Sequence, residues 1–147
     1  MLGPSGPEEE PGRVEIKARR YRCVPCKAVS TVVPQEILAR RLYSASAIGL
    51  ALALWALAQA TAAQVRRRIS PAKIVGPTAA SGWATLRRWA RAVQHKKLFA
   101  STPAPRRDAT LRQVAASAAA ALCASADPTS RGLALCARAF FGAAQAA

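Results

Sequence analysis

The stretch LYSASAIGLALALWALAQATAAQV, residues 42–65, carries no charged side chain and is bracketed by Arg40-Arg41 and by Arg66-Arg67-Arg68. Its length would allow a membrane span. A membrane span is disfavoured because the stretch contains polar side chains and because its alanine-rich interior is only marginally hydrophobic. We therefore expect a buried helix from Ser44 to Gln59, with Ser44 as its N-cap. The alternative is a small membrane-associated protein with one spanning helix at 42–65.

The residues that follow predict two more helices. In 61–69, Val65 and Ile69 lie four residues apart before Ser70-Pro71 ends the pattern. In TAASGWATLRRWARAV, residues 78–93, large apolar side chains recur every three or four residues opposite a run of arginines, which predicts an amphipathic helix. Leu98-Phe99 is a predicted apolar anchor after it. Together these segments predict a trihelical helix-turn-helix unit over residues 40–99.

The charge of the chain predicts its class of partner and limits its chemistry. Lys and Arg number 22 against 7 Asp and Glu, a formal net charge of +15. A charge of this size favours a polyanionic partner, either nucleic acid or an anionic membrane surface. The few carboxylates are scattered or lie in one N-terminal triplet, and the single histidine, His95, stands beside two lysines. Because no paired acid and base can be recognised, we expect no enzymatic activity.

Composition divides the rest of the chain. Residues 1–12, rich in Pro, Gly and Glu, predict a disordered leader, and the alternation that begins at Val14 predicts a short strand within a partial zinc ribbon over 13–36. Residues 100–108 are expected to be a linker. An alanine-rich helical hairpin is expected over 109–147, with helices at 110–126 and from Ser130 to about 144. The expected fold class is mainly α, with a short N-terminal β remnant, the helix-turn-helix unit and this hairpin.

The four cysteines form one pair and two isolated residues. Cys23 and Cys26 have the spacing at which two thiolates on a tight turn chelate one zinc ion. Two ligands alone bind zinc weakly, so the site is incomplete unless a homo-oligomer or an upstream segment supplies two more. Cys123 and Cys136 are expected to be small buried hydrophobic residues.

The order of these features resembles the transposase-associated proteins of GC-rich bacteria, in which a Cys-x-x-Cys zinc ribbon precedes a helix-turn-helix unit. The matching segments are RRYRCVPC at 19–26, VVP at 32–34, ARRLYSASAIGLALALWAL at 39–57, VRRRISP at 65–71 and GWATLRRWARAV at 82–93. The resemblance implies attachment to DNA on behalf of a separately encoded transposase. The family's earlier Cys-x-x-Cys is missing here, which is consistent with an N-terminally truncated ribbon.

The charge, the helical pattern and the resemblance together predict a non-catalytic, cytoplasmic protein of the nucleoid that binds duplex DNA. In a helix-turn-helix unit the last helix lies in the major groove, so the helix from about Ala80 to Gln94 is the expected reader. The predicted DNA-binding residues are Arg66, Arg67, Arg68, Ser81, Thr85, Arg87, Arg88 and Arg91. Leu86, Trp89 and Val93 are expected to pack this helix onto Leu52, Trp55 and Val65. The competing hypotheses are that the arginines form only a solvated helix face, or that the chain scaffolds a partner protein through its alanine-rich helices.

Overall fold

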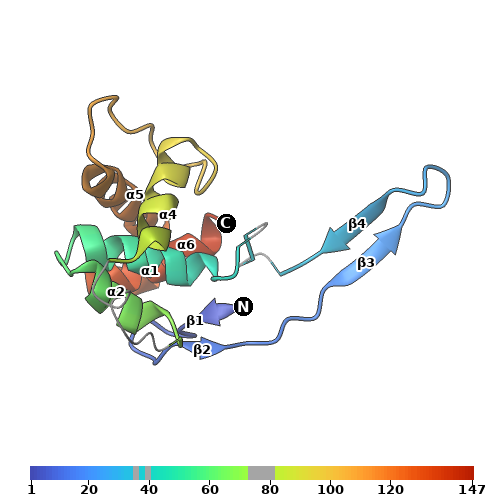
Figure 1. Ribbon diagram of the computed structural model, residues 1–147, viewed down its shortest axis with the longest axis horizontal. Helices are drawn as coiled ribbons and strands as arrows, with labels where there is room; N and C mark the ends of the chain where they lie inside the picture. The colour runs from blue at the N-terminus through green and yellow to red at the C-terminus, as the bar shows by residue number, and fades with distance from the viewer. Residues whose placement is uncertain (35–36, 39–40, 73–81) are drawn as a thin grey trace.

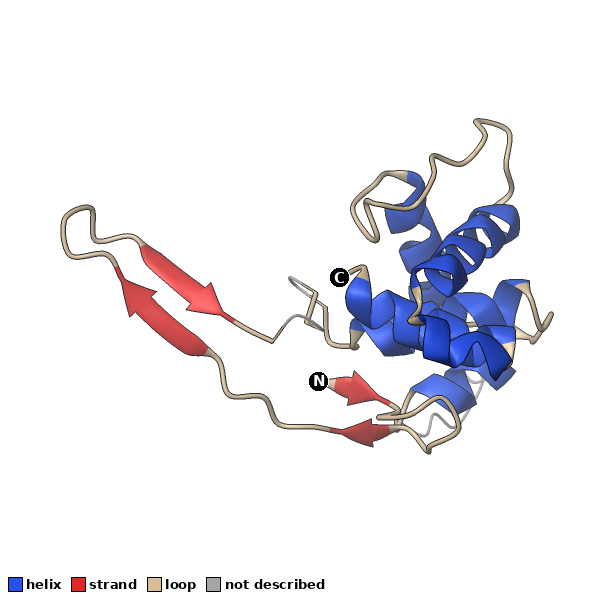
Figure 2. Cartoon of the chain, turned by 180° about the vertical axis from the view of Figure 1, so that it is seen from behind, coloured by secondary structure: helices blue, strands red, loops and turns tan. Residues whose placement is uncertain are grey.

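The computed structural model describes residues 1–34, 37–38, 41–72 and 82–147, and within them the chain is mainly helical with a small N-terminal β part, as predicted (Figures 1 and 2). The α-helices are α1 (Ala45–Ala56), α2 (Ala62–Ile69), α4 (Ala84–Gln94), α5 (Leu111–Ser125) and α6 (Leu135–Gln145). Two antiparallel sheets of two strands pair β1 (Leu2–Gly3) with β2 (Gly12–Arg13) and β3 (Arg19–Arg22) with β4 (Val29–Val32).

The uncharged stretch forms two helices with a turn between them. The Ser44 hydroxyl caps α1 by accepting a hydrogen bond from the amide of Ala47 at 3.1 Å, which confirms the predicted N-cap. The helix ends at Ala56, and Gln59 lies in the left-handed region with φ of 55°. Thr61 then opens α2 through a capping box with Gln64. Of the helices in the described ranges, none has the length and apolar character that a bilayer crossing needs.

Helix α1 is the centre of a core to which every described α-helix contributes. Ten of its twelve residues are buried, so it is covered on all sides. Its main neighbours are α5 and α6, and α2 packs mostly against α1, while α4 packs chiefly against α5 (Figure 1). The predicted separation of a trihelical unit from a C-terminal hairpin is therefore not reflected in the packing. The physical reason is that a helix apolar on every side needs more partners than two short neighbours can provide.

Two glycines allow the helices around α1 to approach closely. A Cβ added at Gly49 would lie 2.4 Å from Ala143 Cβ and 2.8 Å from the carbonyl oxygen of Ala139, so α1 and α6 nearly touch there. A Cβ at Gly142 would lie 1.8 Å from the carbonyl oxygen of Leu122, on α5. Such contacts compensate for the small area that alanine buries, because close backbone approach increases the number of dispersion contacts.

Replacing Gly142 with alanine is therefore expected to lower the free energy of unfolding by about 1–3 kcal/mol, because the backbone of α5 must move. The effect opposes helix propensity, by which alanine is favoured over glycine by about 1 kcal/mol. Gly132→Ala is the matched control, since a Cβ there has open space. Urea unfolding followed by circular dichroism measures both variants. Equal stability of the two would contradict the close α5–α6 contact.

The N-terminal residues are ordered, which corrects the expected disorder of residues 1–12. Strand β1 pairs with β2 on one side, and on the other the Leu2 amide donates to the Leu42 carbonyl at 2.7 Å while the Ser44 amide donates to the Leu2 carbonyl at 3.2 Å. The guanidinium of Arg68 donates to the backbone carbonyls of Pro7 and Glu9. These hydrogen bonds come from residues distant in sequence. They satisfy backbone N–H and C=O groups of a segment whose amino-acid composition alone indicates disorder.

Helix α4 begins later than expected. Residues 78–81 of the predicted helix lie outside the described residues, and Gly82 has φ of 74° before Trp83 takes an extended N-cap conformation. The rings of Tyr43, Trp83 and Trp89 meet edge to face, with centroids 5.0–5.8 Å apart. The Tyr43 hydroxyl donates to the Ser70 hydroxyl at 2.9 Å. This aromatic cluster joins the start of α4 to the segments that flank α1 and α2.

The C-terminal helices follow a short 3₁₀ segment. Thr110 and Gln113 form the predicted capping box at the start of α5. The last helix was expected to begin at Ser130, but residues Pro128–Gly132 form the 3₁₀ helix η1 and α6 begins at Leu135. The reason is local, because the Asp127 carboxylate accepts from the amide of Thr129 at 2.8 Å and closes a tighter turn.

Candidate nucleic-acid interface

Helix α4 has one buried apolar face and one exposed basic face. Leu86, Trp89 and Val93 are buried, as the sequence predicts, and they belong to the same core cluster as Leu52 and Val65. The buried side chains recur every three or four residues, so the positions between them point outward. The exposed positions carry Arg87, Arg88 and Arg91. The hydrophobic contacts of α4 therefore fix which way these three arginines point.

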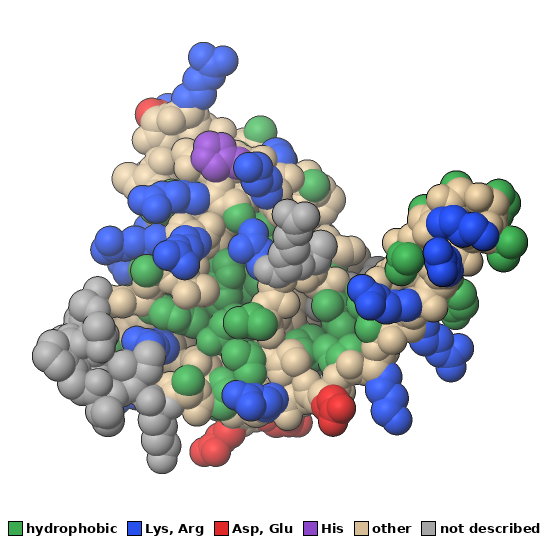
Figure 3. Space-filling model, turned by 45° about the vertical axis from the view of Figure 1, so that its right-hand side comes forward, with side chains coloured by type: hydrophobic (Ala, Val, Ile, Leu, Met, Phe, Trp, Pro, Cys, Tyr) green, Lys and Arg blue, Asp and Glu red, His purple; other side chains and the backbone are tan. Residues whose placement is uncertain are grey.

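The turn that follows α4 extends its exposed cationic surface. Leu98 and Phe99 are 2% and 3% exposed, which confirms the predicted anchor. Their burial fixes the turn that precedes them, in which His95 and Lys97 are exposed. We call Arg87, Arg88, Arg91 and Lys97 the α4 basic face. Figure 3 shows Lys and Arg side chains gathered around His95 on this side of the molecule.

Two neighbouring cations are used within the chain. The Lys96 ammonium donates to the carbonyls of Ala100, at 3.4 Å, and Thr102, so it holds the loop after α4. The Arg106 guanidinium pairs with Asp108 at 3.2 Å on the surface. These contacts reduce the number of cations that a polyanion could engage near α4.

Most of the carboxylates visible in Figure 3 lie away from the α4 basic face. Among the described residues, Arg87, Arg88 and Arg91 form no ion pair with Asp or Glu. In Figure 3 most Asp and Glu side chains lie along the edge opposite His95. Within the described ranges, no ion pair therefore neutralises the arginines of α4, and this is the electrostatic condition for binding a polyanion.

The arginines of α2 are in a different environment from those of α4. Arg67 is exposed and Arg66 is half-buried. The guanidinium of Arg68 holds the N-terminal segment, with 28% of its side chain exposed and the Glu8 carboxylate 3.9 Å away. Arg68, which was predicted to contact DNA, therefore has a role inside the protein. Its hydrogen bonds go to backbone carbonyls of a segment distant in sequence, so no side-chain pattern indicated them.

Of the two remaining residues predicted to contact DNA, the structure describes one. Thr85 is half-buried in the first turn of α4. Ser81 lies outside the described residues.

Trp55 was expected to pack beneath α4, but it is half-buried under the guanidinium of Arg112. That guanidinium lies 5.4 Å from the ring centroid and donates to Gln59 at 2.8 Å.

The paired cysteines lie on the turn of the β3–β4 hairpin. The Cys23 amide donates to the Ala28 carbonyl at 2.8 Å, and the Lys27 amide donates to the Cys23 carbonyl at 3.0 Å. Both thiols are exposed. Hydrogen bonds from the Ala28 amide and the Cys23 thiol lower the pKa of Cys26, which favours its thiolate. No third His, Cys, Asp or Glu completes a metal site within the described residues.

The other two cysteines belong to the helical body. Cys123 is 5% exposed and its thiol donates to the Leu135 carbonyl at 3.1 Å, as expected of a small buried residue. Burial raises the pKa of the Cys123 thiol. Cys136 is only half-buried, and burial raises its pKa as well. Both thiols are therefore poorer thiolate donors than Cys26.

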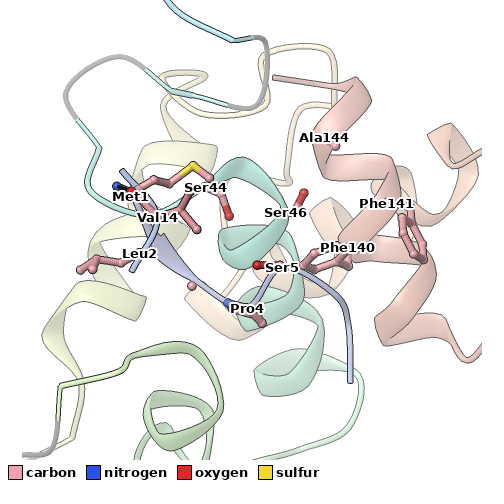
Figure 4. Close-up of a pocket in the computed structure, with 11 residues that line it drawn as sticks. Met1, Leu2, Pro4, Ser5, Val14, Ser44, Ser46, Phe140, Phe141 and Ala144 are labelled. Atoms are coloured by element: carbon pink, nitrogen blue, oxygen red, sulfur yellow. Dashed lines mark hydrogen bonds between the residues drawn. The ribbon is translucent and has the colours of Figure 1, made fainter. Parts of the chain in front are cut away.

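A pocket of about 330 Å³ lies between the N-terminal strand and α6 (Figure 4). Met1, Leu2 and Pro4 line it from the N-terminal segment, and Phe140 lines it from α6. Its lining contains no Asp, Glu, His or Cys side chain. The hydroxyl of Ser44, also in the lining, accepts the capping hydrogen bond of α1. The pocket therefore provides no acid–base pair, and the α4 basic face is the stronger candidate site.

Comparisons with known proteins found no relative. No family model matches the chain, and neither the curated proteins nor the solved structures yield a significant match.

Proposed function

We propose that this protein binds duplex DNA through the α4 basic face and has no catalytic activity of its own. The observation that carries the proposal is the orientation of α4, which buries Leu86, Trp89 and Val93 and exposes three arginines on one helix. Guanidinium groups donate hydrogen bonds to phosphate oxygens in a fixed geometry, and a rigid helix can match them to the spacing of a DNA backbone.

In this proposal α4 acts as the reader of a helix-turn-helix unit. Its first turn would face base edges, where Thr85 is the described polar residue, and the arginines further along would contact phosphates. Helix α2 would lie across the backbone with Arg66 and Arg67. Association with a transposable element and a separately encoded transposase is part of the proposal and is supported by the sequence resemblance alone.

The salt dependence of DNA binding tests the proposal. If the four cations of the α4 basic face each neutralise a phosphate, log K falls with log salt concentration with a slope of about −4, at roughly −0.9 per contact. Titration of a fluorescent mixed-sequence duplex at several salt concentrations measures this slope. Vesicles of phosphatidylserine in phosphatidylcholine serve as the competing polyanion. Tighter binding to vesicles than to DNA would reject the proposal in favour of a membrane surface.

A further inference from the structure

The β3–β4 hairpin is an arm that projects from the helical body. Figures 1 and 2 both show it extending away from the helices, and residues 17–34 are all exposed. The register joins Arg19 to Val32 and Arg22 to Val29. An isolated two-stranded hairpin is at best marginally stable in water. This arm therefore lacks, within the described chain, the packing that ordinarily holds such a hairpin together.

The end of the arm is built as a metal-binding knuckle. Lys27, directly after the second cysteine, has φ of 60°, a conformation that lets the chain reverse tightly around the Cys23–Cys26 pair. The backbone bonds between Cys23 and Ala28 and between Lys27 and Cys23 close this turn. Both thiols are exposed, and both belong to this one turn. Two sulfur ligands are thus arranged in advance at an exposed tip.

We propose that two copies of this chain join tip to tip around one zinc ion, each supplying the sulfurs of Cys23 and Cys26. Zinc in structural sites takes four ligands in a tetrahedron, and one arm provides half of that number. The arm of a second copy supplies two more sulfur ligands in the same arrangement, and its tip also projects away from the helices. On binding, each thiol loses its proton to the buffer, and four thiolates surround the Zn²⁺.

Charge and apolar area at the tip favour this arrangement. A Zn²⁺ ion with four thiolates carries a net charge of −2, and each tip brings Arg22 and Lys27 beside the cysteines. These cations are attracted to the negative zinc–thiolate cluster. Without the cluster, the cations of the two tips would only repel one another. Val24, which is 79% exposed, lies between the two cysteines and would be covered by the second tip. Zinc binding would thereby stabilise the otherwise unsupported hairpin.

Zinc titration of the full chain under reducing conditions tests the inference. We expect saturation at about one zinc per two chains, together with a change from monomer to dimer in sedimentation velocity. Substitution by Co²⁺ should give the visible absorption of tetrahedral thiolate coordination. The double variant Cys23→Ser/Cys26→Ser should lose both zinc and dimer, while Cys136→Ala, which also removes a thiol, should retain them.

Other outcomes would overturn the inference. These are one zinc per monomeric chain, no zinc binding, or a dimer that survives a chelator and disappears only with added reductant, which would be an intermolecular disulfide. The inference does not rest on DNA binding. Loss of the zinc dimer would leave the salt slope of the α4 basic face in place, and removal of the α4 arginines would leave zinc stoichiometry unchanged.

Discussion

The triple variant Arg87→Ala/Arg88→Ala/Arg91→Ala is expected to bind a mixed-sequence duplex roughly 100-fold more weakly than the native chain at about 0.15 M salt. Each lost phosphate contact removes about 0.9 from the slope of log K against log salt. Three lost contacts therefore reduce the slope by nearly 3 and the affinity by about two orders of magnitude at that salt concentration. Because all three side chains are exposed, the variant should keep its fold.

The control for this variant removes positive charge elsewhere. Arg13 on β2 and Arg131 in η1 are exposed, and replacing both with alanine lowers the net charge without touching α4. Fluorescence anisotropy at several salt concentrations compares the two variants, and circular dichroism checks that both are folded. If the control loses as much affinity per charge as the triple variant, binding depends on net charge and the assignment to α4 is wrong.

Trp89→Ala is expected to cost about 3–5 kcal/mol of unfolding free energy, as is usual for a buried tryptophan. Trp89 is 2% exposed, and its ring lies 5.0 Å from that of Trp83 and 5.2 Å from that of Tyr43. Its removal leaves a cavity and separates the start of α4 from the segment before α1. A domain of this size has a total stability of about 5–15 kcal/mol, so the variant should unfold at a much lower urea concentration.

Tyr21→Ala provides the matched aromatic control. Tyr21 lies on β3 with 54% of its surface exposed, so its removal should change the unfolding of the helical body by no more than about 0.5 kcal/mol. Urea unfolding monitored at the helical circular dichroism band measures both variants. A loss below about 1 kcal/mol for Trp89→Ala would show that the aromatic cluster does not hold α4 in place.

Local rules predicted the features that depend on neighbouring residues. Ser44 as a helix cap, the Thr110–Gln113 capping box and the apolar face of α4 were all visible in the sequence and are present in the structure. Each depends on side chains within one or two turns. The start of α6 was misplaced because the Asp127 side chain and Pro128 favour a 3₁₀ turn over the expected helix.

Long-range contacts explain the features that the sequence did not predict. The N-terminal segment is ordered by its pairing with residues 42–44 and by Arg68, which lies far along the chain. The contact of Gly142 with the backbone of Leu122 could not be read from alanine-rich helices, whose surfaces do not specify a partner. For this reason the C-terminal helices were predicted as a separate hairpin, although they share the core of α1.

The same distinction applies to the candidate site. Exposure of Arg87, Arg88 and Arg91 followed from helical periodicity, since the apolar positions of α4 leave no other orientation for them. The contacts of Arg68 within the chain could not be predicted in this way, because they depend on an acidic and glycine-rich segment that only the fold brings to α2. The tight turn at Cys23 and Cys26 was predictable from spacing, whereas the projection of the whole arm was not.

Mapping of amide chemical-shift changes on addition of a DNA duplex tests the central claim most directly. We expect the largest changes in residues 84–97, which carry the α4 basic face, and small changes in α6. Backbone amides of α4 report the position of the duplex even where arginine side-chain signals are broadened. Changes confined to α6 or to the β3–β4 arm, with α4 unaffected at saturating duplex, would contradict the account.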